Sequence, residues 1–109
     1  MSPTEFVIRR SVWLRGEGPM NSMLLRPSDG KQCCVGIYLS ACGVPNEALE
    51  HTPNAGVIKS QPLVPAWLLS ATANWLYRKN DDIHLHDSDR EAGIQYLFAE
   101  AGVKVTFVD

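Results

Sequence analysis

A nearly unbroken apolar run, Cys33–Cys42, constrains the fold of this 109-residue chain more than any other feature. The run contains no charged residue, and on a helical wheel its apolar side chains cover most of the circumference. The remaining arc holds small residues, Gly36 and Ser40, and Gly43 follows them. A helix without a charged face is stable only when other elements surround it, so we predict a central, buried helix. Its small residues would let another backbone approach closely.

Turn-forming residues bound this predicted helix on both sides. Pro27–Gly30 precede it and favour a turn. We expect the helix to begin at Gln32 or Cys33 and to end at Gly43, which suits a left-handed cap. Pro45 then prevents the helix from continuing.

Strand-forming residues occur near both ends of the chain. Phe6–Leu14 is expected to be extended, and Ser22–Arg26 is expected to form a second short strand after a loop at Gly16–Pro19. Lys104–Val108 alternates as a strand and is expected to pair with an N-terminal strand. Strands at the termini with helices between them indicate an α+β fold. At this length we expect a single domain, residues 1–109, with about three helices, one of them central and buried, and a small sheet that includes the N- and C-terminal strands.

The middle of the chain combines a proline-containing loop with a second helix. We interpret residues 44–64 as a long ordered loop that carries one helical turn at Asn46–Leu49. Pro65 suits the first turn of a helix that ends near Asn80–Asp82. The apolar residues expected on the buried side of that helix are Trp67, Leu68, Ala71 and Trp75.

A third helix is predicted from a start signal and a stop signal. Ser88–Glu91 has the sequence of a capping box, in which the Ser hydroxyl and the Glu carboxylate each bind the other residue's backbone N–H. Gly102 ends the helix, and Val103 is expected to pack back on its last turn. The apolar residues at helical spacing are Ile94, Leu97, Phe98 and Ala101.

Composition excludes several classes of protein. The longest apolar run is too short to span a membrane, and no signal segment opens the chain, so we expect a cytoplasmic protein. Three cysteines do not form a disulfide framework, and in a reducing compartment all three should be thiols. The chain has no dense stripe of Lys and Arg, which argues against direct binding to duplex nucleic acid. No motif indicates a cofactor.

The net charge of -2 conceals an uneven distribution along the chain. Residues 1–79 carry eight Lys and Arg against five Asp and Glu, whereas residues 80–109 carry two against seven. One interpretation is that these opposite charges pair within the molecule beside a solvated acidic loop. Another is that an acidic surface binds a basic partner. For that second interpretation the candidate binding residues, expected to be exposed, are Arg15, Asp81, Asp82 and Asp87.

The adjacent thiols allow a different hypothesis. Cys33 and Cys34 stand where the buried helix is expected to begin, and a helix N-terminus favours the thiolate. A small cysteine-dependent hydrolase or transferase would use one of them as its nucleophile, with His84 or His86 as the base. The alternative is that both thiols are small packing groups. His84 and His86, with Asp82 on the same face, also allow a metal-site hypothesis.

Five motifs follow one another along most of the chain, outside residues 44–64. They are Trp13–Gly16, Lys31–Gly36, Asn80–Asp82, Asp89–Glu91 with Ile94 and Phe98, and Gly102–Asp109. In this order they resemble a set of small phage- and prophage-encoded proteins that are marked by a Cys-Cys-Leu-Gly run and a later Asn-Asp. Val35 stands where Leu is usual. The resemblance implies a phage or prophage source, the cytosol of a bacterial host and an accessory role. It implies no particular enzymatic activity.

Together these observations favour a non-enzymatic accessory protein that binds a host or phage macromolecule, with a protein as the expected partner. The thiol hydrolase or transferase is the alternative hypothesis. The sequence leaves the oligomeric state open, and a homodimer is among the options. It also leaves open whether residues 44–64 fold over the buried helix.

Overall fold

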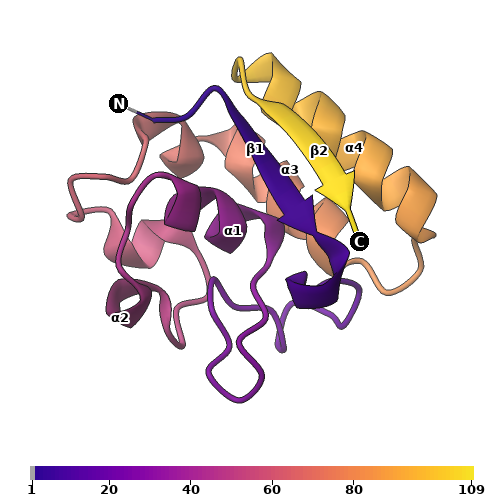
Figure 1. Ribbon diagram of the computed structural model, residues 1–109, viewed down its shortest axis with the longest axis horizontal. Helices are drawn as coiled ribbons and strands as arrows, with labels where there is room; N and C mark the ends of the chain where they lie inside the picture. The colour runs from indigo at the N-terminus through magenta and orange to yellow at the C-terminus, as the bar shows by residue number, and fades with distance from the viewer. Residues whose placement is uncertain (1) are drawn as a thin grey trace.

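The computed structural model describes residues 2–109 and shows a small α+β fold in which helices pack against a two-stranded sheet (Figure 1). The strands come from the two ends of the chain, and all the α-helices lie between them in sequence. The regular elements are β1 (Glu5–Arg9), α1 (Cys34–Ala41), α2 (Asn46–Leu49), α3 (Ala71–Asp81), α4 (Asp87–Glu100) and β2 (Lys104–Val108), with short 3-10 helices at Arg10–Val12, Ala55–Ile58 and Ala66–Leu69.

The two strands confirm the predicted pairing of the chain ends, and they run parallel. Phe6 lies opposite Val105 and Ile8 lies opposite Phe107. Parallel strands need a crossover connection, and here the whole helical part of the chain forms that connection. Figure 1 shows β2 between β1 and α4, so β1 has a strand neighbour on one side only. Along β1 the side chains alternate between buried and exposed, which gives the sheet one core face and one solvent face.

Helix α1 is the buried central helix that the apolar run predicts. Five of its eight residues are buried, and it packs against β1 and α3. A Cβ atom at Gly36 would collide with the backbone carbonyl of Leu24, so the small residue allows the close approach expected from the sequence. Gly43 adopts a positive φ of 94° just after the helix, as a left-handed cap requires.

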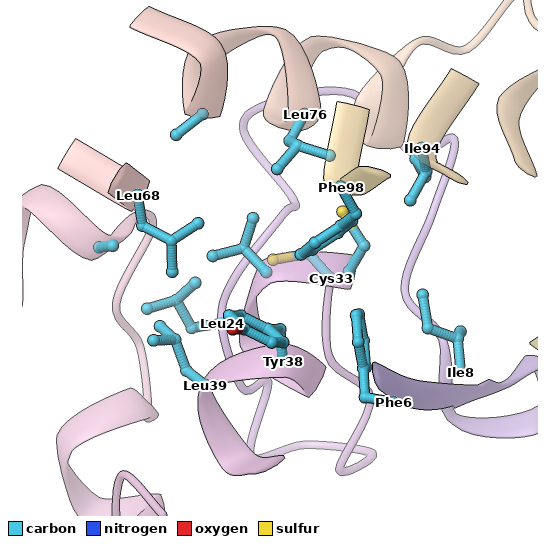
Figure 2. Close-up of a cluster of buried hydrophobic side chains, with 14 of the residues drawn as sticks. Phe6, Ile8, Leu24, Cys33, Tyr38, Leu39, Leu68, Leu76, Ile94 and Phe98 are labelled. Atoms are coloured by element: carbon cyan, nitrogen blue, oxygen red, sulfur yellow. The ribbon is translucent and has the colours of Figure 1, made fainter. Parts of the chain in front are cut away.

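An aromatic cluster joins the elements that surround α1. The Phe6 ring lies 5.0 Å from the ring centroids of both Tyr38 and Phe98, and Trp67 lies 5.5 Å from Phe98. Figure 2 shows Phe6, Tyr38 and Phe98 facing one another in the interior. These tilted and edge-to-face contacts bring β1, α1 and α4 together, and each adds about 0.5–1.5 kcal/mol beyond the burial of area.

Two predicted elements are wrong. Ser22–Arg26 forms no strand, because only Leu25 and Arg26 make isolated bridges there. The second helix does not begin at Pro65. A 3-10 turn follows that proline, the backbone is extended at Ser70, and α3 begins at Ala71. The shift rotates the buried side of α3, so that Trp75 is 54% exposed and not part of the core.

The predicted capping box at Ser88–Glu91 is also wrong, although α4 itself is present. Helix α4 begins at Asp87, with His86 at the N-cap position and no side-chain cap, so Ser88 lies inside the first turn. Glu91 instead accepts two hydrogen bonds of 2.8 Å from Arg10, which ties α4 to the chain after β1. The end of the helix is as predicted, since Gly102 has a φ of 80° and the Val103 N–H returns to the Phe98 carbonyl.

We expect Gly36→Ala to destabilise the protein by at least about 2 kcal/mol, because the added methyl group would push α1 away from a backbone carbonyl that cannot rotate aside. Gly93→Ala in α4 is the matched control. Its Cβ would meet only the flexible side chain of Lys79, 3.2 Å from Cδ, and alanine favours a helix by up to about 1 kcal/mol. Urea unfolding of both variants measures the difference. Equal stability of the two variants would contradict the close packing at Gly36.

Candidate functional site

The two adjacent thiols lie inside the core. Cys33 and Cys34 are fully buried, and the Cys33 Sγ atom caps α1 by accepting a 3.5 Å hydrogen bond from the Gly36 N–H. Burial raises the pKa of Cys33 to about 12 and raises the pKa of Cys34 well above its ordinary value. Desolvation therefore raises the thiol pKa by more than the helix N-terminus lowers it. Both thiols stay protonated and out of reach of a substrate in this conformation.

The two histidines lie apart from the thiols, in the connection between α3 and α4. His84 is exposed in a turn, where its backbone N–H binds the Asp82 carboxylate at 2.8 Å, and His86 precedes α4. No hydrogen bond links either imidazole to Cys33 or Cys34 within residues 2–109. In the same part of the chain no three His, Cys, Asp or Glu side chains gather as a metal site would require. The thiol and metal hypotheses therefore gain no support from the geometry.

Arg15 and Asp87, two of the proposed binding residues, bind each other. The Arg15 guanidinium donates to Asp87 Oδ2 at 3.1 and 3.2 Å, and it lies 4.5 Å from the centre of the Trp13 ring. Its remaining donor reaches the backbone carbonyls of Arg10 and Trp13. The hydrogen bond from Arg15 is the main reason that the pKa of Asp87 is lowered. The expectation that Arg15 stands exposed for a partner is wrong, because the side chain is only 23% exposed.

Asp81 is buried, which also differs from the expectation. It lies in the last turn of α3, is 8% exposed, and accepts a 3.0 Å hydrogen bond from the side chain of Asn80. Burial raises its pKa, and the side chains of Asn80 and Ser22 and the charge of Arg90 oppose that effect only in part. No Lys, Arg or His side chain within residues 2–109 forms an ion pair with Asp81. Buried carboxylates are usually paired, so this one is a candidate for contact with a ligand or partner.

Two adjoining surface hollows meet at Asp81. One has a volume of about 490 Å³ and the other about 480 Å³, and both are lined by Pro19, Tyr77 and Asp81. Tyr77 stands between the hollows, with its hydroxyl held by the Ala55 N–H at 2.8 Å. The second hollow is walled mainly by apolar atoms and has Asp82 and Ile83 at its rim. We call the two hollows and their rim the α3 surface.

Several large apolar side chains are exposed at this surface. Leu69 and Ile83 line the hollows directly, and Met20 follows the lining residue Pro19 in the chain and is 93% exposed. The Trp75 ring lies 5.2 Å from the guanidinium of Arg78, which lines the second hollow. A group of exposed apolar residues beside hollows is typical of an interaction site rather than of an ordinary surface.

Two residues that hold this surface in place were not identified from the sequence as functional. Asn80 Oδ1 accepts from the Trp13 indole N–H at 2.8 Å and from the Cys34 N–H at 3.0 Å, while its amide donates to the Leu14 carbonyl. Arg90 is buried and donates to the carbonyls of Lys79, Asp82 and Leu85. Both residues fall within the motifs Asn80–Asp82 and Asp89–Glu91, but nothing in those motifs indicates burial.

Comparison of the chain with protein-family models, with curated proteins and with solved structures gives no significant match. No helix within residues 2–109 is long and apolar enough to cross a membrane. The function is therefore inferred from the residues of the α3 surface.

We expect Cys33 and Cys34 to react with a thiol reagent at neutral pH at least about a hundredfold more slowly than Cys42, because modification requires local opening of the core. Cys42 is only partly buried and serves as the internal reference. Mass spectrometry of the labelled peptides measures each rate, and all three thiols should react readily in denaturant. Rapid labelling of Cys33 or Cys34 in the folded protein would restore the thiol hypothesis.

We expect Asp81→Asn to stabilise the protein at neutral pH. The folded-state pKa of Asp81 lies above its ordinary value, so the ionised carboxylate destabilises the fold at high pH. That effect disappears when the pH falls below both the folded and the unfolded pKa, at about pH 3, because Asp81 is then protonated in both states. The gain from Asp81→Asn should therefore shrink as the pH falls.

Urea unfolding across this pH range measures the gain. Glu50→Gln, which changes an exposed carboxylate just after α2, is the control and should alter stability by less than about 0.5 kcal/mol. A loss of stability in Asp81→Asn at neutral pH would mean that the ionised form is internally stabilised, contrary to its lack of an ion pair.

Proposed function

We propose that this protein is a non-enzymatic accessory protein of a phage or prophage, acting in the cytoplasm of a bacterial host by binding a partner protein at the α3 surface. A component of host defence or replication is an example of such a partner. The observation that carries the proposal is the position of Asp81. It is a buried carboxylate without an ion-pair partner in residues 2–109, at the junction of two hollows with exposed apolar side chains.

The chemistry of Asp81 favours a cationic group as its ligand. In a partly desolvated site a charge interacts much more strongly with an opposite charge than it does in water. A Lys or Arg side chain entering either hollow would reach the carboxylate, and Asp82 at the rim adds a second negative charge. Arg90 is near enough for its charge to oppose the rise in the pKa of Asp81, but it donates its hydrogen bonds to backbone carbonyls and forms no ion pair with Asp81 within residues 2–109.

The apolar rim supports a protein as the partner rather than a small ion. Trp75, Met20 and Ile83 are all more than half exposed. Ile83 lines the second hollow, Met20 follows the lining residue Pro19 in the chain, and the Trp75 ring lies beside the lining residue Arg78. Aromatic residues, Met and Arg are enriched in protein interfaces, and a few such residues supply most of the binding energy. A partner segment that places a basic residue between apolar ones fits this arrangement.

The phage or prophage source and the accessory role rest on the resemblance in sequence motifs. Cys33–Gly36 begins the buried helix, and Asn80–Asp82 ends α3 beside the two hollows. The motifs that suggest the family therefore include the residues that build the α3 surface, which is consistent with a shared binding role.

The proposal is tested by affinity capture from infected and uninfected bacterial lysates, followed by quantitative mass spectrometry. If a partner binds the α3 surface, Asp81→Asn and Trp75→Ala should each weaken its affinity by about tenfold or more. Tyr96→Ala is the matched control, because Tyr96 is an aromatic residue on α4 that is 65% exposed outside the α3 surface. Calorimetry with the purified partner then gives each affinity.

Two results would overturn the proposal. One is a capture that yields no partner above background from a protein that is also inactive in phage-defence assays. The other is a partner that still binds Asp81→Asn and Trp75→Ala with unchanged affinity, which would place its contact elsewhere.

A further inference from the structure

The outer edge of β1 has backbone groups without partners. In the parallel ladder Lys104 donates to the Thr4 carbonyl at 2.8 Å, so the N–H and C=O groups of Phe6 and Ile8 face β2. Those of Glu5 and Val7 must then point away from β2. Within residues 2–109 no other hydrogen bond reaches the backbone of Val7. Figure 1 likewise shows no strand on that side of β1.

An open strand edge is a template for another strand, and most proteins cover or block such edges. Here the side chains on the solvent face of the edge are Glu5, Val7 and Arg9. Val7 is 49% exposed, and neither Glu5 nor Arg9 forms an ion pair within the described part of the chain. The edge therefore presents a negative charge, an apolar centre and a positive charge at equal spacing.

We propose that β1 pairs with β1 of a second copy of this chain, antiparallel and centred on Val7. In that register Val7 lies opposite Val7 of the second copy, and Glu5 lies opposite Arg9 at both ends. Opposite charges in directly facing positions stabilise a pair of strands, and each contact occurs twice because the dimer is two-fold symmetric. The result is a continuous four-stranded sheet with β2 at each outer side.

The backbone fits the same register. With Val7 as a hydrogen-bonded pair, its N–H and C=O exchange two bonds with those of the second copy. The N–H of Arg9 and the C=O of Glu5 face the edge in the same way and supply two more. Other registers lose these features. Parallel in-register pairing places Glu5 beside Glu5, and a shift of two residues places each charge opposite Val7 or outside the strand.

This dimer is separate from the proposed partner site. The α3 surface is built from α3 and its neighbouring loops, and none of its lining residues belongs to β1. Each copy in the dimer therefore keeps its own α3 surface, and either proposal can fail without the other.

Exchanging the charges at residues 5 and 9 tests the proposal. Analytical ultracentrifugation over a range of protein concentrations measures the molecular mass of each variant in solution. Glu5→Arg and Arg9→Glu each create like-charged pairs and should weaken the dimer by about tenfold. The double variant Glu5→Arg/Arg9→Glu restores opposite charges and should dimerise like the original protein. A mixture of the two single variants should form a heterodimer, because one copy then carries two Arg and the other two Glu.

Val7→Pro removes the central edge N–H and leaves the β2 ladder intact, so it should abolish the dimer, whereas Val7→Thr should retain it. Circular dichroism establishes that each variant is folded. The proposal is overturned if the original protein is a monomer at every concentration, in which case the charges only block the edge. It is also overturned if the dimer is insensitive to charge exchange and to Val7→Pro.

Discussion

The structure depends on the buried side chain of Asn80, because a buried amide must satisfy all its hydrogen-bonding groups or destabilise the fold. Its oxygen binds the indole of Trp13 and the N-terminus of α1 at Cys34, and its nitrogen binds the Leu14 carbonyl and the Asp81 carboxylate. The fully buried amide of Asn80 thus joins the segment after β1, the start of the central helix and the end of α3. An unpaired buried polar group costs about 1–3 kcal/mol, so these three segments take up one relative arrangement.

Arg90 completes the arrangement from the other side. Its guanidinium binds the carbonyl of Lys79 in the last turn of α3 and the carbonyl of Asp82 just after the helix, and so fixes the connection into α4. Gly16 is required beside it, since its φ is 67° and a Cβ there would lie 2.9 Å from the Arg90 guanidinium. The Asp81 carboxylate is therefore held at the floor of the α3 surface by residues that do not themselves line either hollow.

The sequence predicted the elements that are set by residues close together in the chain. It did not predict the features that depend on packing between distant segments. The uncharged run, the Gly43 cap and the Gly102 cap each act within one helix, and all three are confirmed. The prediction placed the start of α3 at Pro65 because proline suits a first helical turn, but only a 3-10 turn follows it, and Ser70, a common N-cap residue, directly precedes α3. Ser88 is not a cap because Glu91, its expected partner, binds Arg10 from a distant part of the chain. The burial of Asp81 was missed for the same reason, since it depends on contacts between remote segments.

Some charged residues form ion pairs within the fold, and others do not. Three of the seven acidic residues in 80–109 form ion pairs within residues 2–109: Glu91 and Asp109 with Arg10, and Asp87 with Arg15 and Arg90. Two other places combine unpaired charge with an unusual position. Asp81 is buried without an ion-pair partner within residues 2–109, and β1 aligns opposite charges along an open edge. A buried unpaired charge destabilises the isolated fold, and an open edge exposes it to unwanted pairing. Both features become favourable when a partner supplies the opposite charge, which is why they mark the two surfaces through which this protein is proposed to act.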